Sequence, residues 1–215
     1  MEKTFLSIGA GPGIGLSTAI RFAKEGYRPI LASRTPEKLN NLAHTIQKAT
    51  GLEAETYPLD AGDMQQMAEF GSRFSPTVVH FNAAIVHAET LAEATLQSME
   101  LDIRVGITAA MAAIKVFAPA MLQRKEGTIL LTGGGFAYSP SADYLTLGVA
   151  KAGIHNMAHA LFPVFAEQNV HIACLNITRA IAPASPEAEE VAEAFWRLHS
   201  QTRAQWVCEA KDVGE

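Results

Sequence analysis

One short stretch near the start of the sequence constrains the fold more than any other. Residues 4–8 form an apolar run typical of a buried strand, and the glycine-rich sequence Gly-Ala-Gly-Pro-Gly-Ile-Gly occupies positions 9–15. From Leu16 to Lys24 the apolar residues have helical spacing. A strand, a tight turn and a helix in this order are typical of a site for a dinucleotide pyrophosphate, because glycines let the phosphates approach the backbone and the helix N-terminus offers free N–H groups.

The spacing of the glycines differs from the common G-x-G-x-x-G pattern, and a purely structural turn is the alternative interpretation. The position of the turn directly between a strand and a helix favours nucleotide binding. The candidate phosphate-binding residues are Gly9, Gly11, Pro12, Gly13, Ile14 and Gly15.

Length, charge and cysteine content limit the function classes. A chain of 215 residues with 48% apolar and 18% charged residues suits a single α/β domain with a full core. The net charge of −5 gives no electrostatic case for nucleic acid or an anionic membrane as a partner. Cys174 and Cys208 lie in apolar, strand-like runs, which is typical of a reduced protein. No apolar run approaches membrane-spanning length and no targeting segment is visible, so we expect a cytoplasmic protein.

The rest of the chain alternates between strand-like and helix-like segments. Five further strands and a possible sixth are expected at 27–33, 52–59, 77–81, 128–132, 170–175 and 204–209. Further helices are expected after Thr35-Pro36, at 93–124, at 143–168 with a kink at Pro163, and at 186–200. This alternation predicts one Rossmann-like domain over residues 1–215, a doubly wound parallel sheet of about seven strands with helices on both faces.

The end of the second strand indicates which cofactor is bound. In a dinucleotide fold this position faces the adenosine ribose, where a carboxylate accepts the ribose hydroxyl and an arginine accommodates a 2′-phosphate. The chain has Ser33-Arg34 here and no acidic residue. NADP(H) is therefore favoured over NAD(H), with a solvated arginine at a helix start as the alternative.

Taken together, these features resemble the short-chain dehydrogenase/reductase family over nearly the whole chain. The matching positions are the glycine motif, Asp60 after the third strand, Asn82-Ala83-Ala84 in place of the usual Asn-Asn-Ala-Gly, the strand after Gly127, Lys151, and the segment that begins at Pro186. The resemblance implies that Asp60 and Ala61 contact the adenine, that the Asn82 loop lines the cofactor cleft, and that Lys151 hydrogen-bonds the nicotinamide ribose.

The catalytic positions depart from the family pattern. The family uses a Tyr-x-x-x-Lys pair, with a serine thirteen residues before the tyrosine, to transfer a proton and hold the substrate oxygen. Here Lys151 is present, but Leu147 stands at the tyrosine position and Gly134 at the serine position. The asparagine that the family places in its long helix falls at about Asp102. Both reacting hydroxyl groups are thus absent at matching positions.

The C-terminal part departs as well. The Pro-Gly that follows the sixth strand in the family falls at about Ile177-Thr178, and few residues separate it from Pro186. Family members usually carry a substrate-covering lid in this region. We therefore expect a shortened lid.

Several residues are candidates to replace the missing acid, or to bind a metal. Tyr144 lies one helical turn before Leu147, and His87 lies five residues after Asn82; the alternatives are a packed aromatic ring and a surface histidine. His155 and His159 have the i,i+4 spacing of a metal pair, but no further ligand cluster is visible in the sequence and we expect no metal.

Two functional hypotheses follow, with a third in which the fold serves assembly alone. The favoured one is an NADP(H)-binding protein of oxidoreductase descent without efficient carbonyl or alcohol redox catalysis, with a small-molecule substrate or none. The alternative is an active NADPH-dependent oxidoreductase on a small carbonyl or alcohol, with Tyr144 or His87 as the acid. A homodimer or homotetramer is expected through helices 93–124 and 143–168, because their apolar content is wide. It includes Met111, Ile114, Met157, Phe162 and Phe165.

Overall fold

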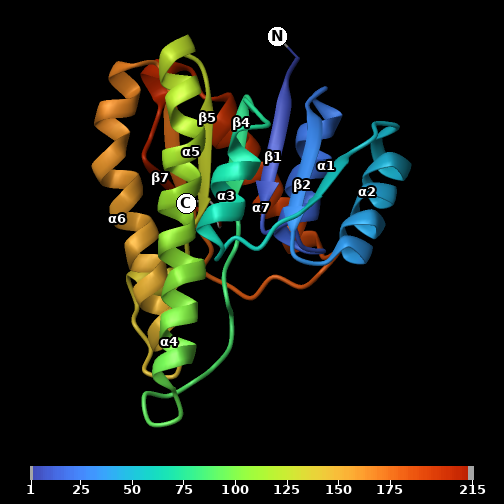
Figure 1. Cartoon of the computed structure of the whole chain (residues 1–215). Helices are drawn as coiled ribbons and strands as arrows, with labels where there is room; N and C mark the ends of the chain where they lie inside the picture. Colours follow the sequence, from blue (N-terminus) through green and yellow to red (C-terminus); the bar gives the residue numbers. More distant parts are fainter. Residues whose placement is uncertain (1, 213–215) are drawn as a thin grey trace.

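The computed structural model describes residues 2–212, which form one seven-stranded sheet with helices on both faces (Figure 1). The strand order is β3-β2-β1-β4-β5-β6-β7, and every neighbouring pair is parallel. The strands are β1 (Thr4–Ile8), β2 (Arg28–Ser33), β3 (Glu55–Pro58), β4 (Val78–Phe81), β5 (Thr128–Thr132), β6 (His171–Asn176) and β7 (Glu209–Lys211). The predicted doubly wound parallel sheet is confirmed.

The helices join successive strands across the sheet. They are α1 (Ile14–Lys24), α2 (Pro36–Thr50), α3 (Met64–Gly71), α4 (Leu96–Ile103), α5 (Ala109–Arg124), α6 (Leu145–Glu167) and α7 (Pro186–Ser200). A π-helical turn, Arg104–Thr108, connects α4 to α5, and short 3₁₀ turns occupy Gly135–Ala137 and Arg203–Gln205. Parallel pairing requires crossovers of this kind, and they cover both faces of the sheet.

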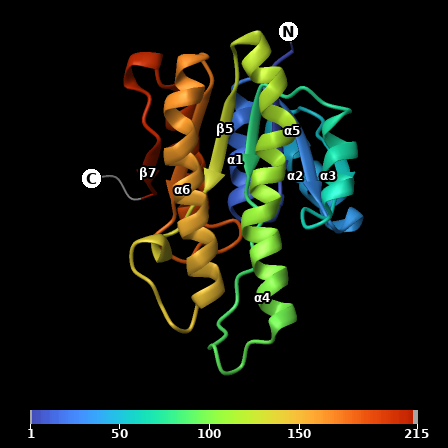
Figure 2. The same cartoon turned by 60° about the vertical axis from the view of Figure 1, so that its left-hand side comes forward.

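The core has two layers, one on each face of the sheet. One layer packs α3, α5 and α6 against the sheet, with Phe81, Phe117 and Met121 among its buried residues. The other packs α1, α2 and α7 against the opposite face, around Phe22 and Phe195. Figure 2 shows the first layer from outside, with α5 and α6 side by side in front of the strands. The sheet is therefore covered on both sides, as expected for strands whose residues are almost all apolar.

The strand order places a switch point between β1 and β4. From β1 the chain proceeds to β2 and β3 on one side of the sheet, then returns to β4 on the other side of β1. Loops that leave the carboxyl ends of these two strands therefore run in opposite directions. In open α/β sheets a crevice forms at this point, and ligands bind there.

One long apolar helix differs from the sequence expectation. The continuous helical stretch Leu96–Arg124 is long and apolar enough, by length and composition, to cross a membrane. The expectation that no apolar run approaches that length is therefore wrong. Half of its apolar window is buried inside the fold, and residues such as Ala109, Ala113 and Phe117 pack in the core. Burial in the core accounts for this apolar composition.

Several element boundaries also differ from the sequence expectations. Helix α3 was not predicted; it is short, and Asp63 caps it by accepting hydrogen bonds from the backbone N–H groups of Gln65 and Gln66 at 3.0 Å. The last strand lies at Glu209–Lys211, later than expected, because 203–205 form a 3₁₀ turn. Helix α6 begins at Leu145 and continues through Pro163. Short elements have too few residues for a periodic signal, which explains the differences at α3 and β7. Helix α6 begins later than expected because the backbone of Tyr144, its N-cap, is not helical.

Candidate functional site

The turn between β1 and α1 requires glycine at two positions. Gly9 has a φ of +81°, and a Cβ there would lie 2.5 Å from the backbone of Ala83. A Cβ on Gly15 would lie 3.1 Å from the Cα of Ala10, so the turn packs tightly on the start of the helix. Gly11, in contrast, has open space around it. The turn is thus held close to the loop after β4, at the switch point of the sheet.

The start of α1 follows the glycine turn directly. Gly13 is the N-cap residue; over residues 2–212, no side chain caps this helix and its first turn contains no acidic residue. Uncapped N–H groups and the positive end of the helix dipole attract anionic groups. The backbone of Ile181, Ala182 and Pro183 approaches the space above Gly13 to 4.0 Å. This turn is therefore suited to a phosphate, with the segment after β6 beside it.

Two hydrogen bonds attach the glycine turn to the end of β2. The backbone N–H groups of Gly9 and Ala10 both donate to the carbonyl oxygen of Ala32, at 2.9 and 3.1 Å. Ser33 and Arg34 follow directly, and Arg34 is exposed. The fold thus brings the guanidinium-bearing residue to the edge of the glycine turn, at the position where a dinucleotide fold places the adenosine ribose.

Asp60 and Ala61 follow β3 on the same edge of the sheet. The Asp60 carboxylate accepts a hydrogen bond from the backbone N–H of Gly62 at 2.9 Å, which forms a tight Asx turn. Ala61 is buried, whereas Asp60 is exposed. This turn leaves one face of Asp60 available at the position that the resemblance assigns to the adenine.

Asn82 joins three strands at the switch point. Its side-chain N–H donates to the Gly9 carbonyl at 3.0 Å, and its side-chain oxygen accepts from the Thr132 hydroxyl at 2.9 Å. Its backbone N–H donates to the Ile8 carbonyl at 2.8 Å. Ala83 and Ala84 continue this loop along the cleft. Asn82 therefore positions the glycine turn and the end of β5 relative to each other.

A buried polar chain continues from Asn82 into the sheet. The Nε2 atom of His80 lies 3.0 Å from the Thr132 hydroxyl, and its Nδ1 atom lies 3.5 Å from that of Ser7. Since the Thr132 hydroxyl donates to Asn82, His80 must carry its proton on Nε2. Burial lowers the pKa of His80 to about 3, so the ring is neutral. Sequence reasoning missed His80 and Thr132, because a polar residue inside an apolar strand gives no periodic signal.

Lys151 lies on α6, opposite the end of β5. Its Nζ atom donates to the Thr132 carbonyl at 2.8 Å. Burial lowers the pKa of Lys151 to about 8, while the nearby Cys174 thiol acts in the opposite direction. Burial also raises the pKa of Cys174 to about 12, so this thiol is protonated and unreactive at neutral pH.

Gly134 and Leu147 both lie next to Lys151. A Cβ on Gly134 would lie 3.0 Å from Cγ of Lys151, so the lysine stem packs over this glycine. Leu147, one helical turn before Lys151, is buried with 6% of its surface exposed. The lysine stem thus packs over Gly134, and a buried aliphatic side chain stands one turn before Lys151 on the same helix.

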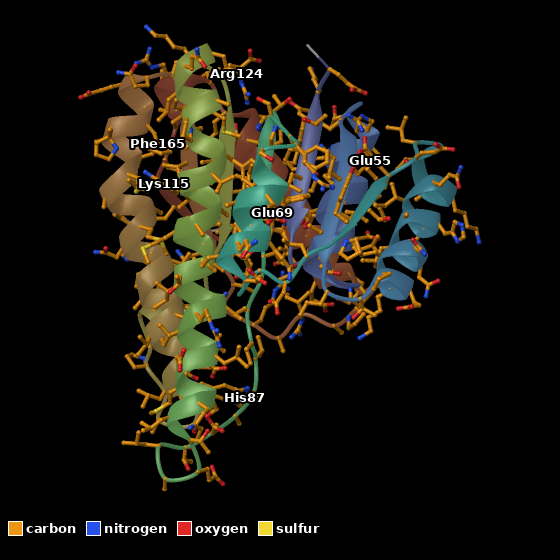
Figure 3. All side chains as sticks on the ribbon, in the orientation of Figure 1. Glu55, Glu69, His87, Lys115, Arg124 and Phe165 are labelled. Atoms are coloured by element: carbon orange, nitrogen blue, oxygen red, sulfur yellow. The ribbon has the colours of Figure 1, made fainter. Side chains whose placement is uncertain are left out.

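Asp102 forms part of a second polar cluster near the start of α6. Its carboxylate is 5% exposed and accepts a 2.6 Å hydrogen bond from the Thr146 hydroxyl. The Nε2 atom of His87 lies 3.7 Å from this carboxylate and 3.6 Å from that of Glu89. Figure 3 places His87 beside α4, at the lower end of the molecule. The π-helical turn begins two residues after Asp102, and such turns are common at functional sites.

Tyr144 is the N-cap residue of α6 and not part of its first turn. Its ring stacks on Phe136, with 4.9 Å between ring centroids. A bridge pairs its backbone with that of Glu89 in the loop after β4. The sequence places Tyr144 on the helical face of Leu147, but its non-helical backbone removes it from that face.

A model of the family described as short chain dehydrogenase matches residues 3–189. The very-long-chain 3-oxoacyl-CoA reductase of Mycosarcoma maydis is 28% identical over 180 residues, which cover 78% of this chain and 50% of that protein. The chain thus spans about half the length of the curated reductases that it matches in this way.

Solved structures share the fold over nearly the whole chain. A short-chain dehydrogenase from Rhodopseudomonas palustris superposes with a TM-score of 0.87 at 26% identity, covering 97% of both chains. A metagenomic short-chain oxidoreductase in complex with NADP superposes with a TM-score of 0.88 at 22% identity, covering 97% of this chain and 96% of that one.

Proposed function

This chain belongs to the short-chain dehydrogenase family, and we propose that it is an NADP(H)-binding member without efficient carbonyl or alcohol redox catalysis. In this proposal Gly134 and Leu147 stand where the family carries its catalytic serine and tyrosine. One domain binds the cofactor, and the segment 177–185 between β6 and α7 serves as a shortened lid. The protein acts in the cytoplasm.

NADP(H) binding is supported by the agreement of several features at one sheet edge. The turn at Gly9 brings the backbone close, the start of α1 is uncapped, and Arg34 lies exposed beside them. A structural relative is bound to NADP. We propose that residues 9–15 hold the pyrophosphate, Ser33 and Arg34 the 2′-phosphate, Asp60 and Ala61 the adenine, and Lys151 the nicotinamide ribose.

The observation that carries the catalytic part of the proposal is the environment of Lys151. When NADPH is bound it supplies a hydride, and the protein must supply a proton and hold the substrate oxygen. The ammonium group of Lys151 is present, with its pKa lowered by burial to about 8. Beside it, the Gly134 position is covered by the lysine stem and Leu147 is buried. Neither residue has a hydroxyl group to donate.

Titration of the protein with NADPH and with NADH tests cofactor binding. We expect tighter binding of NADPH, and the Arg34→Ala variant should lose about 1–3 kcal/mol of NADPH binding free energy with little change for NADH. Lys38→Ala is the matched control, because Lys38 is an exposed cation in the first turn of α2, a few residues after Arg34. Equal losses for both cofactors in Arg34→Ala would contradict the assignment of the 2′-phosphate.

Restoring the missing hydroxyl groups tests the catalytic part. The wild-type protein should bind NADPH without measurable oxidation of it in the presence of a panel of small aldehydes and ketones. The double variant Gly134→Ser/Leu147→Tyr should gain turnover, because a phenol one turn before Lys151 would lie beside its ammonium group. Turnover by the wild-type protein comparable to that of a typical dehydrogenase would overturn the proposal.

The alternative, an active NADPH-dependent oxidoreductase on a small carbonyl or alcohol, has one specific observation in its favour. His87 lies within 4 Å of two carboxylates, those of Glu89 and Asp102, and Asp102 is buried. In this alternative the imidazole of His87 is the proton donor to the substrate oxygen. In that case His87→Gln should abolish turnover, with Asp102 acting as a positioning residue.

We further propose that the chain forms a homodimer or homotetramer through α5 and α6. Of the apolar residues expected at that interface, Ile114 and Phe165 are buried within the chain, and Met157 and Phe162 pack partly against the core. Met111 remains 48% exposed, and Val149 and Val164 on α6 are also exposed. Light scattering at several protein concentrations tests this, and Val164→Glu should shift the population toward monomer.

A further inference from the structure

Two histidines and a glutamate converge at the corner between α6 and β7. His155 and His159 are one helical turn apart on α6, and Glu209 is the first residue of β7. Figure 2 shows β7 running beside α6. The sequence predicts no metal at this histidine pair because no further ligand is visible near it, but folding brings in Glu209 from about 50 residues away.

The ligand atoms of these three side chains lie close to one point. Nε2 of His155 is 3.0 Å and Nε2 of His159 is 3.1 Å from Oε2 of Glu209. All three ligand atoms lie within 4.8 Å of one another. The side chains of His155, His159 and Glu209 are 30%, 43% and 36% exposed, so an ion can reach them from solvent.

We propose that His155, His159 and Glu209 bind one zinc ion or a similar divalent transition-metal ion. In a tetrahedral zinc site with bonds of about 2.0–2.2 Å, neighbouring ligand atoms are about 3.3–3.6 Å apart. The two nitrogen–oxygen separations, 3.0 and 3.1 Å, need only lengthen by a few tenths of an ångström to reach this range. The ion would replace the protons through which the two imidazoles now contact the carboxylate.

The types of donor atom select the class of metal. Imidazole nitrogen suits Zn²⁺, Cu²⁺ and Ni²⁺, whereas Mg²⁺ and Ca²⁺ require mainly oxygen ligands. Cys208 adds a soft donor nearby, since its Sγ atom lies 3.6 Å from both ring nitrogens of His159. Two histidines and a glutamate leave a fourth tetrahedral position open to water or to this thiol.

The surroundings of Glu209 also fit a metal ligand. The Tyr138 hydroxyl donates to its carboxylate, and the Tyr138 hydroxyl in turn accepts from the Asn176 side chain at 3.0 Å. Such outer hydrogen bonds orient carboxylate ligands in metal sites. A bound ion would fasten the short edge strand β7 to α6. This proposal is independent of NADP(H) binding.

Metal titration of the full chain tests the proposal. The protein is treated with a chelator, dialysed and titrated with Zn²⁺ by calorimetry, and bound zinc is then measured by elemental analysis. We expect one zinc per chain and a thermal unfolding midpoint that rises with Zn²⁺ concentration, because the ion binds only the folded chain. Mg²⁺ at the same concentration should leave the midpoint unchanged.

Single variants locate the site. His155→Gln, His159→Gln and Glu209→Gln should each weaken Zn²⁺ binding at least about tenfold, because even the loss of an outer hydrogen bond costs that much in metal sites. His44→Gln is the matched control, since His44 is an exposed histidine on α2. Circular dichroism confirms that each variant is folded, as expected for partly exposed side chains.

Three results would overturn the proposal. The first is the absence of zinc binding by the wild-type protein. The second is wild-type affinity in the His155 and His159 variants. The third is a loss in His44→Gln, or in a His87→Gln variant of the cluster with Glu89 and Asp102, as large as the loss in the His155 and His159 variants.

Discussion

The two ends of the cleft are built under different constraints. At the first end, which we call the cofactor end (residues 9–15, 33–34, 60–61 and 82–84), backbone atoms approach each other closely and Asn82 joins three strands. At the second, the reacting end (Gly134, Leu147 and Lys151), side chains fill the space and only Lys151 is polar. Close backbone contacts tolerate few residue types, whereas a packed aliphatic site tolerates several. The cofactor end is thus the more constrained of the two.

A substitution at Gly9, in the cofactor end, should have the largest effect on folding stability and on NADPH binding. Gly9→Val should lower the free energy of unfolding by about 2–5 kcal/mol, because a side chain there adopts a left-handed backbone and overlaps Ala83. NADPH binding should be lost with it. Urea unfolding and fluorescence titration measure both. Gly11→Ala is the control and should cost less than about 1 kcal/mol, since nothing lies near its Cβ position. Equal effects at the two glycines would remove the special role of Gly9.

A smaller loss of stability is expected when Asn82, which connects the glycine turn to the end of β5, is replaced. Asn82→Ala removes the hydrogen bond to the Gly9 carbonyl and leaves the Thr132 hydroxyl without its acceptor. We expect a loss of about 1–3 kcal/mol in the free energy of unfolding, because buried polar groups lose their partners. Asn40→Ala, an exposed change on α2, should be nearly neutral. A neutral Asn82→Ala would mean that the strands hold the cleft together without it.

At the reacting end, Lys151 should cause a pH-dependent change in folding stability of similar or smaller size. Burial lowers the pKa of Lys151 from 10.5 to about 8. Between these two pH values the lysine is protonated in the unfolded chain and mostly deprotonated in the folded protein, so the unfolded chain binds more protons. Wild-type stability should therefore rise with pH across this window, relative to Lys151→Met. We expect a relative change of roughly 1–3 kcal/mol, since solvent reaches part of the side chain. A stability difference that stays constant from pH 7 to 10 would contradict the burial of this charge.

Tyr144 should show the smallest effect. Because its ring stacks on Phe136 outside the first turn of α6, Tyr144→Phe should change the free energy of unfolding by less than about 0.5 kcal/mol. Any residual NADPH oxidation should also be unchanged. Tyr57→Phe, on β3, serves as the control for loss of a phenol. A tenfold fall in NADPH oxidation in Tyr144→Phe, without such a fall in Tyr57→Phe, would show that the phenol of Tyr144 takes part in catalysis.

Most of the sheet could be predicted from the sequence because the signals are local. The apolar runs at 4–8, 77–81 and 128–132 agree with the observed limits of β1, β4 and β5 to within one residue, since a buried strand needs a continuous apolar run. Element boundaries were predicted less accurately where apolar and polar residues do not follow one clear period. The start of α6 and the position of β7 differ from expectation because Tyr144 and the segment 203–205 adopt local turns.

The candidate site divides in the same way. Residue types at the glycine turn and at Arg34 are visible in the sequence because each follows a recognisable strand, and Lys151 is visible because it lies early in a long predicted helix. The polar chain from Ser7 through His80 and Thr132 to Asn82 is not visible, since its members lie on three different strands. The hydrogen bonds of this polar chain form only in the register in which those strands pair.

By itself, the sequence determined the alternation of strands and helices, apart from the short helix α3, and the glycine turn. These properties depend on steric freedom and side-chain periodicity over a few residues. Only the tertiary structure decided that Leu147 is buried beside Lys151, that Tyr144 leaves the helical face, and that Glu209 meets the pair of histidines on α6. Contacts between residues far apart in the chain depend on how the whole sheet packs, and no local pattern encodes them.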